Sequence, residues 1–163
     1  MLGKLTRHLS ADEEAVLRSR MQPRSVAANA TLITAGEPND TLFFVTEGEF
    51  LVSLPFAAGP MPVGTRARGT WLGELTLLTP GPATATVTAA HDSEVLALSA
   101  ATLAELTTSH PGLVAHLVRA LSEDLAQRIR TAGVVLDQAP AKPPPGMLKG
   151  VFGRLFGGGE AKS

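Results

Sequence analysis

The chain of 163 residues contains no cysteine and no tyrosine, and it has only one tryptophan and six phenylalanines. Without cysteine it forms no disulfide, no thiolate metal site and no cysteine nucleophile. The shortage of aromatic residues argues against a broad aromatic binding surface. Fourteen basic residues against fifteen acidic ones give a net charge of -1. A net charge so close to zero gives no electrostatic indication of nucleic-acid binding.

Long apolar runs are also missing from the sequence. No segment reaches the roughly 20 apolar residues that a membrane-spanning helix needs. The first residues lack the apolar core of a secretory signal and turn acidic at Asp12. We therefore expect a cytoplasmic protein. The length predicts one domain and a tail, and 44% hydrophobic with 18% charged residues indicates a globular fold.

No pattern of catalytic or metal-binding residues stands out. The spacings of the four histidines do not place two of them four residues apart on one helix, as a zinc-binding helix would. These histidines are His8, His91, His110 and His116. No serine, histidine and acidic set has a recognisable context. The sequence thus predicts a protein that is not an enzyme and has no metal site.

Short apolar runs separated by turn residues fill the chain from residue 25 to residue 99, which is typical of an all-β sandwich, barrel or roll. The predicted strands are residues 31–33, 41–46, 50–54, 84–89 and 93–98. Glu47-Gly48-Glu49 is predicted to be a tight turn that joins residues 41–46 and 50–54 in a hairpin. Residues 55–62 are predicted to be a loop.

Helical patterns flank this region. Ser10, with Glu13 three residues later, is a capping-box pattern that predicts a helix ending near Met21. Ser99 is predicted to cap a second helix, and Pro111 to begin a long third helix that reaches residue 138.

The long helix carries apolar residues at a spacing of mostly four, which places them on one face. They are Leu113, Leu117, Leu121, Leu125, Ile129, Ala132, Val135 and Leu136. At 1.5 Å per residue the helix would be about 40 Å long, which is more than one side of a small domain needs. The face therefore predicts either a homodimer through residues 111–138 or a cover for its own domain.

The last 25 residues have a different composition. Residues 139–146 are predicted to be an extended proline-rich linker. Residues 147–163 form a glycine-rich tail in which pairs of apolar residues recur every four positions. The pairs comprise Met147, Leu148, Val151, Phe152, Leu155 and Phe156. Three interpretations stay open for this tail: docking to a protein partner or scaffold, weak contact with a membrane, or no role.

Four segments in the middle of the chain, in order, resemble the cyclic-nucleotide-binding domain family, found in catabolite activator proteins, protein kinase A regulatory subunits and gated ion channels. The four segments are residues 33–45, 47–49, 69–75 and 83–89. The resemblance spans residues 10–138 and implies a mainly β fold, a jelly-roll-like β-roll with flanking helices and a long C-terminal helix. We therefore expect one domain over residues 1–138.

The resemblance implies a cyclic mononucleotide as the candidate ligand, and it assigns roles to particular residues. Gly73 would let the backbone approach the ligand closely. Glu74 would accept hydrogen bonds from a ribose hydroxyl, or would instead cap the helical turn that follows it. The free N–H groups of the turn from Leu75 would face the phosphate. Thr84 and the N–H of Ala85 would contact the phosphate or the base.

Two departures from the family pattern matter for function. The family places an arginine against the cyclic phosphate where this sequence has Ala83, and a methyl group cannot replace a bidentate guanidinium. Arg66, Arg68 or Arg128 could supply the charge from another direction, or each is a solvated surface residue. The family's transcription factors continue into a helix-turn-helix domain, whereas this chain continues into prolines. We therefore expect no DNA binding.

The leading hypothesis is a non-catalytic regulatory or adaptor module with a degenerate phosphate cassette, whose tail docks to a larger assembly. The alternative is a genuine sensor of cyclic AMP or cyclic GMP that signals through the C-terminal helix. The two hypotheses make different predictions. An adaptor binds its partner equally with or without nucleotide, whereas a sensor loses its response when Glu74→Ala removes the acceptor of the ribose hydrogen bond.

Overall fold

The structure of the protein, a computed structural model, describes residues 8–79 and 81–137, with side chains as far as residue 130. The chain divides into two compact units, residues 1–124 and 125–163. The predicted linker and tail, residues 139–163, lie outside the described residues. The same holds for the predicted docking residues Met147, Leu148, Val151, Phe152, Leu155 and Phe156.

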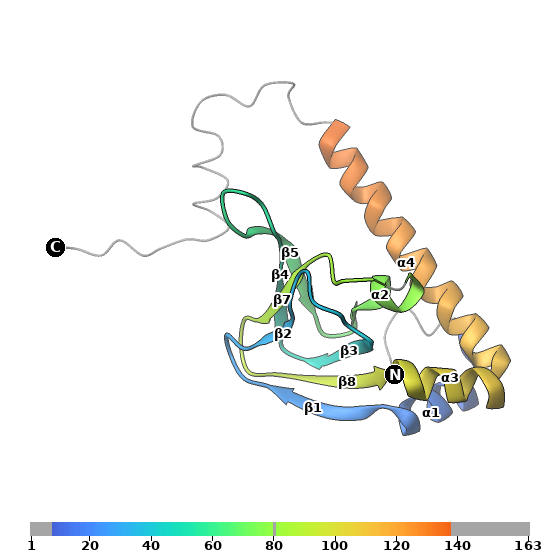
Figure 1. Cartoon of the computed structure of the whole chain (residues 1–163). Coiled ribbons are helices and arrows are strands. Elements are labelled where there is room, and N and C mark those ends of the chain that lie inside the picture. Colours follow the sequence, from blue (N-terminus) through green and yellow to red (C-terminus); the bar gives the residue numbers. More distant parts are fainter. Residues whose placement is uncertain (1–7, 80, 138–163) are drawn as a thin grey trace. The chain divides into compact units, whose positions relative to one another are not determined.

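In the described part of the first unit, eight strands form two antiparallel sheets of four strands each (Figure 1). The first sheet has the order β1 (Gln22–Val26), β8 (Ser93–Ser99), β3 (Thr41–Glu47), β6 (Trp71–Leu72). The second has the order β2 (Thr31–Ile33), β7 (Thr86–Ala89), β4 (Glu49–Leu54), β5 (Met61–Ala67). The prediction of a β-roll flanked by helices is confirmed.

Strand β3 contributes to two hydrophobic cores at once. Leu42 and Phe44 pack with the helices on the outer face of the first sheet. Phe43 and Val45 pack between the two sheets, because successive side chains of a strand point to opposite faces. With both faces covered, these four residues are at most 3% exposed. This explains why the sequence shows a continuous apolar run there and no alternation.

Three helices contribute buried residues to the core on the outer face of the first sheet: α1 (Ala11–Arg20), α3 (Ala100–Ser109) and the first part of α4 (Pro111–Asp137). The predicted capping box of α1 is present. The Ser10 hydroxyl accepts the N–H of Glu13 at 3.2 Å, and the Glu13 carboxylate accepts the N–H of Ser10 at 2.8 Å. Ser99 caps α3 as predicted. None of the helices in the described residues is both long and apolar enough to span a membrane.

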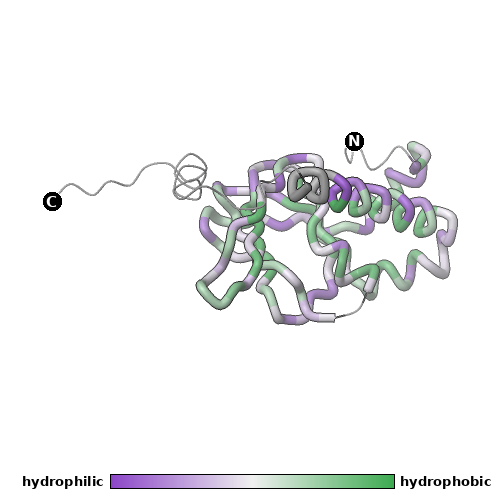
Figure 2. The backbone as a smooth tube through the Cα atoms, turned by 90° about the horizontal axis from the view of Figure 1, so that it is seen from above, coloured by the Kyte–Doolittle hydropathy of each residue, from purple (hydrophilic) through white to green (hydrophobic). Residues whose placement is uncertain are grey.

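The predicted apolar face of α4 divides into two parts. Leu113, Leu117 and Leu121 are at most 2% exposed and belong to the core of the first unit. Ile129, in the second unit, is 65% exposed. Figure 2 shows hydrophobic and hydrophilic residues alternating along the helix, as expected for an amphipathic helix. The first part of the face therefore covers its own domain, and a homodimer through the helix stays a prediction.

Two histidine–glutamate pairs join the N-terminal region to α4. His8 Nε2 lies 2.7 Å from Glu123 Oε2, and His116 Nδ1 lies 3.0 Å from Glu13 Oε1. The hydrogen bond with His8 is the main cause that lowers the pKa of Glu123. The backbone N–H of Ser10 is the main cause that lowers the pKa of Glu13. Folding therefore favours the charged form of both carboxylates.

The prediction of a hairpin from residues 41–46 and 50–54 is wrong. Strands β3 and β4 belong to different sheets, and the chain passes from one sheet to the other at Gly48 (Figure 1). Ser93 fills the space beside Gly48, where an added Cβ would lie 2.9 Å from the Ser93 Cα. Strand β4 instead pairs with β7 and with β5, which begins inside the predicted loop at Met61.

Candidate functional site

The predicted cassette, which we define as residues 73–85 and call the cassette segment, begins with a short helix. The predicted helical turn is present as α2 (Glu74–Leu78), and Gly73 is its N-cap residue with a φ of +81°. Glu74 is 7% exposed, whereas Leu75 is 38% exposed. The Glu74 carboxylate is therefore buried at the start of a helix, where a negative charge also interacts favourably with the helix dipole.

The space beside Gly73 is filled by the protein itself. An added Cβ at this position would lie 2.5 Å from the carbonyl oxygen of Thr41 and 2.8 Å from Nδ2 of Asn39. Both distances are shorter than real Cβ contacts. The structure thus gives Gly73 a role in packing against residues 34–41, which we call the 34–41 turn. Close approach of the Gly73 backbone to a ligand stays a prediction.

Asn39 and Thr76 connect the 34–41 turn to α2. The Asn39 side-chain amide donates hydrogen bonds to the carbonyl oxygen of Thr41 and to the hydroxyl of Thr76, each at 2.9 Å. The Thr76 hydroxyl donates to the carbonyl oxygen of Gly73 at 3.1 Å. Sequence reasoning missed both residues. Asn39 and Thr76 lie 37 positions apart, and no local pattern pairs them.

The other end of the cassette segment is bound to the same turn. The N–H of Ala83 donates to the carbonyl oxygen of Glu37 at 2.8 Å, and the N–H of Gly36 donates to the carbonyl oxygen of Ala83 at 2.7 Å. The Ala83 side chain is 6% exposed and packs in the apolar core between the sheets, with Ile33 and Val87 among its members. The 34–41 turn therefore holds both ends of the cassette segment.

The remaining predicted ligand-binding residues have different surroundings. Thr84 is exposed and Ala85 is half-buried. Among the arginines considered as substitutes, Arg66 lies on β5 and Arg68 is exposed just after that strand. Arg128 lies on α4 in the second compact unit, whereas the cassette segment belongs to the first. The structure thus brings residues 73–75 and 83–85 together on one turn.

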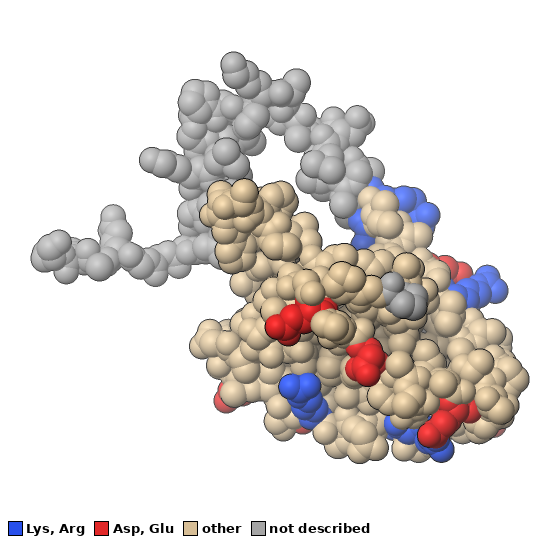
Figure 3. Space-filling model, viewed as in Figure 1, with Lys and Arg blue, Asp and Glu red and all other residues tan. Residues whose placement is uncertain are grey.

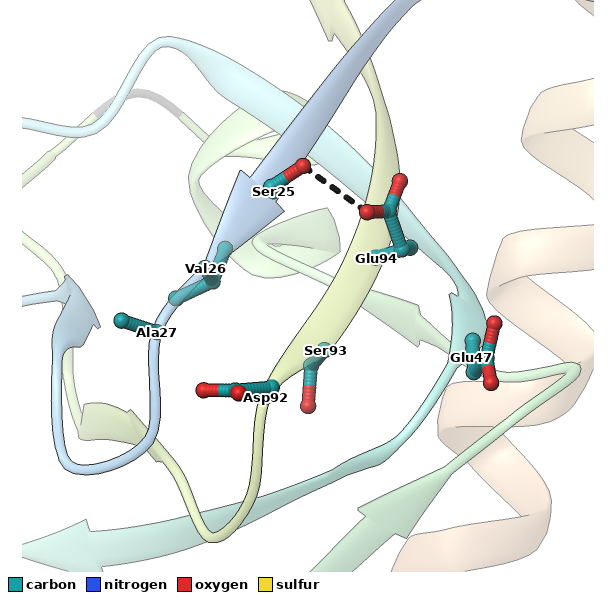
Figure 4. A pocket seen from close by; sticks show the side chains of 7 residues that line it. All are labelled: Ser25, Val26, Ala27, Glu47, Asp92, Ser93 and Glu94. Carbon is teal, nitrogen blue, oxygen red and sulfur yellow. Dashed lines mark hydrogen bonds between the residues drawn. The ribbon is translucent and has the colours of Figure 1, made fainter.

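A separate pocket of about 570 Å³ lies near the other end of β3 (Figure 4). Its lining includes Glu47, Asp92 and Glu94. Two of these carboxylates bind the chain itself: Glu94 accepts a hydrogen bond from the Ser25 hydroxyl, and Asp92 accepts one from the N–H of Ala28, each at 2.8 Å. The described residues contain no group of three or more His, Cys, Asp or Glu side chains that could hold a metal ion.

Comparisons with known proteins agree with this geometry. The family model of the cyclic nucleotide-binding domain matches residues 23–110. A cyclic nucleotide-gated potassium channel of Mesorhizobium japonicum is 36% identical over 91 residues, which are 56% of this chain and 24% of the channel. A cAMP-dependent protein kinase regulatory subunit of Mycosarcoma maydis is 33% identical over 101 residues, which are 62% of this chain and 19% of that subunit.

A solved structure agrees over a larger share of the chain. The N-terminal domain of a transcriptional regulator from Streptomyces coelicolor A3(2) superposes with a TM-score of 0.67 at 30% identity. The match covers 85% of this chain and 94% of that domain. By contrast, the chain spans about a quarter of the channel's length, at 24%, so the likeness to the channel concerns one domain of a larger protein. On its family-model match, which spans more than half of its residues, the chain belongs to the cyclic nucleotide-binding domain family.

Proposed function

We propose that this chain is a non-catalytic regulatory or adaptor module that has lost the family's recognition of the cyclic phosphate and acts through contact with another protein. The relatives that support a regulatory role are named as a nucleotide-gated channel and as the regulatory subunit of a cAMP-dependent kinase. In both, the matched region is a minor part of a longer protein.

The observation that carries the proposal is the environment of Ala83. Its side chain is a methyl group, 6% exposed, within the apolar core between the two sheets. Its backbone N–H and carbonyl are both engaged with the 34–41 turn. A phosphate brought to this position would be taken out of water without a guanidinium to pair with it, and an unpaired buried charge is strongly unfavourable. These facts support a degenerate cassette.

The second candidate is a genuine sensor of a cyclic nucleotide, and one observation favours it. Where the resemblance expects the ribose contact, Gly73 is left-handed and the buried residue Glu74 begins α2. In this case another cation has to reach the phosphate. Arg66, Arg68 and Arg128 are the candidates that the sequence suggested.

Titration calorimetry with cyclic AMP and cyclic GMP separates the two candidates. We expect no binding by the unmodified chain and a gain of binding by Ala83→Arg, which restores the missing guanidinium. The matched control is Thr84→Arg, which adds the same charge at the exposed neighbouring residue and is expected to gain nothing. Micromolar binding by the unmodified chain would contradict the proposal, and Glu74→Gln would then be expected to weaken that binding.

The partner-binding part of the proposal rests on α4 and on the tail. Because Leu113, Leu117 and Leu121 are occupied in the first unit, we propose that a homodimer would use the face from Leu125 to residue 138, where Ile129 is 65% exposed. We keep docking through residues 147–156 as the proposed link to a larger assembly. Light scattering after Ile129→Asp tests the dimer, which should dissociate. Deletion of residues 147–156 tests the link, which should be lost whether or not nucleotide is present.

A further inference from the structure

The hairpin formed by β4 and β5 extends beyond the rest of its sheet. Strand β7 pairs with β4 only from Phe50 to Ser53, whereas the pairing of β4 with β5 continues to Leu54 and Met61. The connecting residues 55–60 are all exposed. Figure 1 shows the loop between β4 and β5 projecting from the roll. We call residues 54–63 the hairpin tip.

The hairpin tip is apolar throughout. It contains no polar or charged side chain, and residues 50–65 as a whole contain no charged one. Phe56 is 52% exposed, Met61 37% and Val63 50%, so three of the large hydrophobic side chains that face solvent gather at this one place. In Figure 3 the corresponding lobe carries no blue or red side chain on the face that is visible. An exposed apolar cluster of this kind marks an interaction site.

The backbone of the hairpin tip needs few hydrogen bonds from water. Pro55, Pro60 and Pro62 have no N–H group to satisfy. The N–H of Gly59 donates to the carbonyl oxygen of Phe56 at 2.9 Å, which closes the turn. Unpaired backbone donors are the main obstacle to placing a chain in an apolar medium. The three prolines and this hydrogen bond lower the number of unpaired donors in the hairpin tip.

The same features disfavour addition of a strand from another protein. The edge strand β5 contains Pro62, which has no N–H, and the register with β4 shifts between Val52 and Ser53, so Val63 bulges out of the ladder. Proline and bulges on an edge strand block pairing with a further strand. An occupant of the hairpin tip therefore has to be apolar and must not depend on backbone hydrogen bonds.

Basic residues lie at the other end of the hairpin. Arg66 is at the end of β5, and Arg68 follows it and is exposed, while Glu49 lies opposite Ala67. From Met61 to Arg66 the strand rises about 17 Å at 3.4 Å per residue. With the hairpin tip embedded 5–10 Å deep, as roughly expected for an interfacial segment, Arg66 would lie about 7–12 Å above a charged surface, which is about one Debye length. Arg68, two residues further on, would lie beyond that length.

We propose that the hairpin tip inserts into the surface of a membrane that contains anionic lipids, with Phe56, Met61 and Val63 in the acyl boundary and Arg66 above the headgroups. A lipid surface accepts apolar side chains without a complementary shape and without hydrogen bonds, which is what the hairpin tip offers. This inference is independent of the function proposed for the cassette segment, because the two concern different surfaces and different ligands.

Co-sedimentation of the full chain with phosphatidylcholine vesicles, with and without phosphatidylserine, tests the proposal. We expect binding to the mixed vesicles. Phe56→Asp is expected to lower the partition coefficient at least about tenfold, because it replaces apolar surface with a charge. Arg66→Gln is expected to lower it by up to about fivefold, and only when phosphatidylserine is present. Ala101→Asp is the control, since it places the same charge at an exposed apolar residue of α3 that has no part in either proposal, and it should change nothing.

A second variant keeps the test independent of folding and of the tail. Phe56→Trp places a fluorophore at the hairpin tip, whereas the native Trp71 is buried. Brominated lipids should quench the new fluorescence and leave that of Trp71 unchanged. No vesicle binding by the full chain would overturn the proposal. So would equal binding by the parent chain and Phe56→Asp, or loss of binding with Phe152→Asp alone, which would assign membrane contact to the tail.

Discussion

A comparison of Gly73→Ala with Gly36→Ala tests whether the cassette segment is packed rigidly against the 34–41 turn. The two glycines have nearly the same backbone conformation, with φ of +81° and +84°. A residue with a side chain pays about 1–2 kcal/mol in this left-handed region. Around Gly36 an added Cβ meets nothing within 4 Å. The cost of Gly36→Ala is therefore expected to be the conformational cost alone, about 1 kcal/mol.

Gly73→Ala adds a steric cost to the same conformational one. The new Cβ would lie 2.5 Å from the carbonyl oxygen of Thr41, which is backbone of β3, and 2.8 Å from the Asn39 amide, which is held by two hydrogen bonds. Neither neighbour is the free end of a flexible side chain. Overpacking of this kind costs about 1–3 kcal/mol, so we expect Gly73→Ala to lower the free energy of unfolding by about 3 kcal/mol.

Urea unfolding followed by tryptophan fluorescence measures both variants. Trp71 is the sole tryptophan, is 1% exposed and lies two residues before Gly73. The expected difference between the variants, about 2 kcal/mol, is roughly a thirtyfold difference in the unfolding constant. Equal losses for the two variants would mean that the 34–41 turn yields to the added methyl group. In that case the described packing of the cassette segment would be wrong.

Three further predictions concern the helices. Ser10→Ala removes one half of the capping box and should lower the free energy of unfolding by about 1 kcal/mol, measured by urea titration. Leu117→Ala empties part of a core position that is 1% exposed and should cost about 2–5 kcal/mol in the same assay. The lowered pKa values of Glu13 and Glu123 predict stability that is present above their ordinary pKa of 4.5 and is lost as the pH falls through the folded-state values. The unfolding midpoint should therefore decrease as the pH is lowered below 4.5. This decrease should be less steep in the doubly substituted Glu13→Gln, Glu123→Gln chain.

Local sequence patterns were sufficient where a single short-range interaction decides the structure. The capping box at Ser10 and the cap at Ser99 depend on residues three positions apart, and both are confirmed. The run from Leu42 to Val45 predicted a strand. A short apolar run that is bounded by turn residues and contains aromatic and β-branched residues is typical of a strand covered on both faces. The family resemblance then supplied the order of the elements, which local patterns alone do not contain.

Predictions failed where distant parts of the chain decide the structure. The turn at Gly48 looks like that of a hairpin, but the close approach of Ser93, 45 residues later, belongs to a corner between two sheets. Strand β5 was not predicted, because Pro62 and Gly64 are unfavourable in a central strand. An edge strand with a bulge, as β5 is, tolerates both residues. The contact of Asn39 with Thr76 was likewise beyond local reasoning.

The attachment of the cassette segment at its two ends has a consequence for protein engineering. The anchors at Ala83 are hydrogen bonds between main-chain atoms, which are indifferent to the side chain present. At the other end, the anchor needs glycine at position 73 together with Asn39 and Thr76. Between these anchors, Leu77 and Leu78 pack against the helical core and Pro82 pairs with Pro38. A foreign segment that is meant to give the scaffold a new specificity therefore has to keep these three contacts.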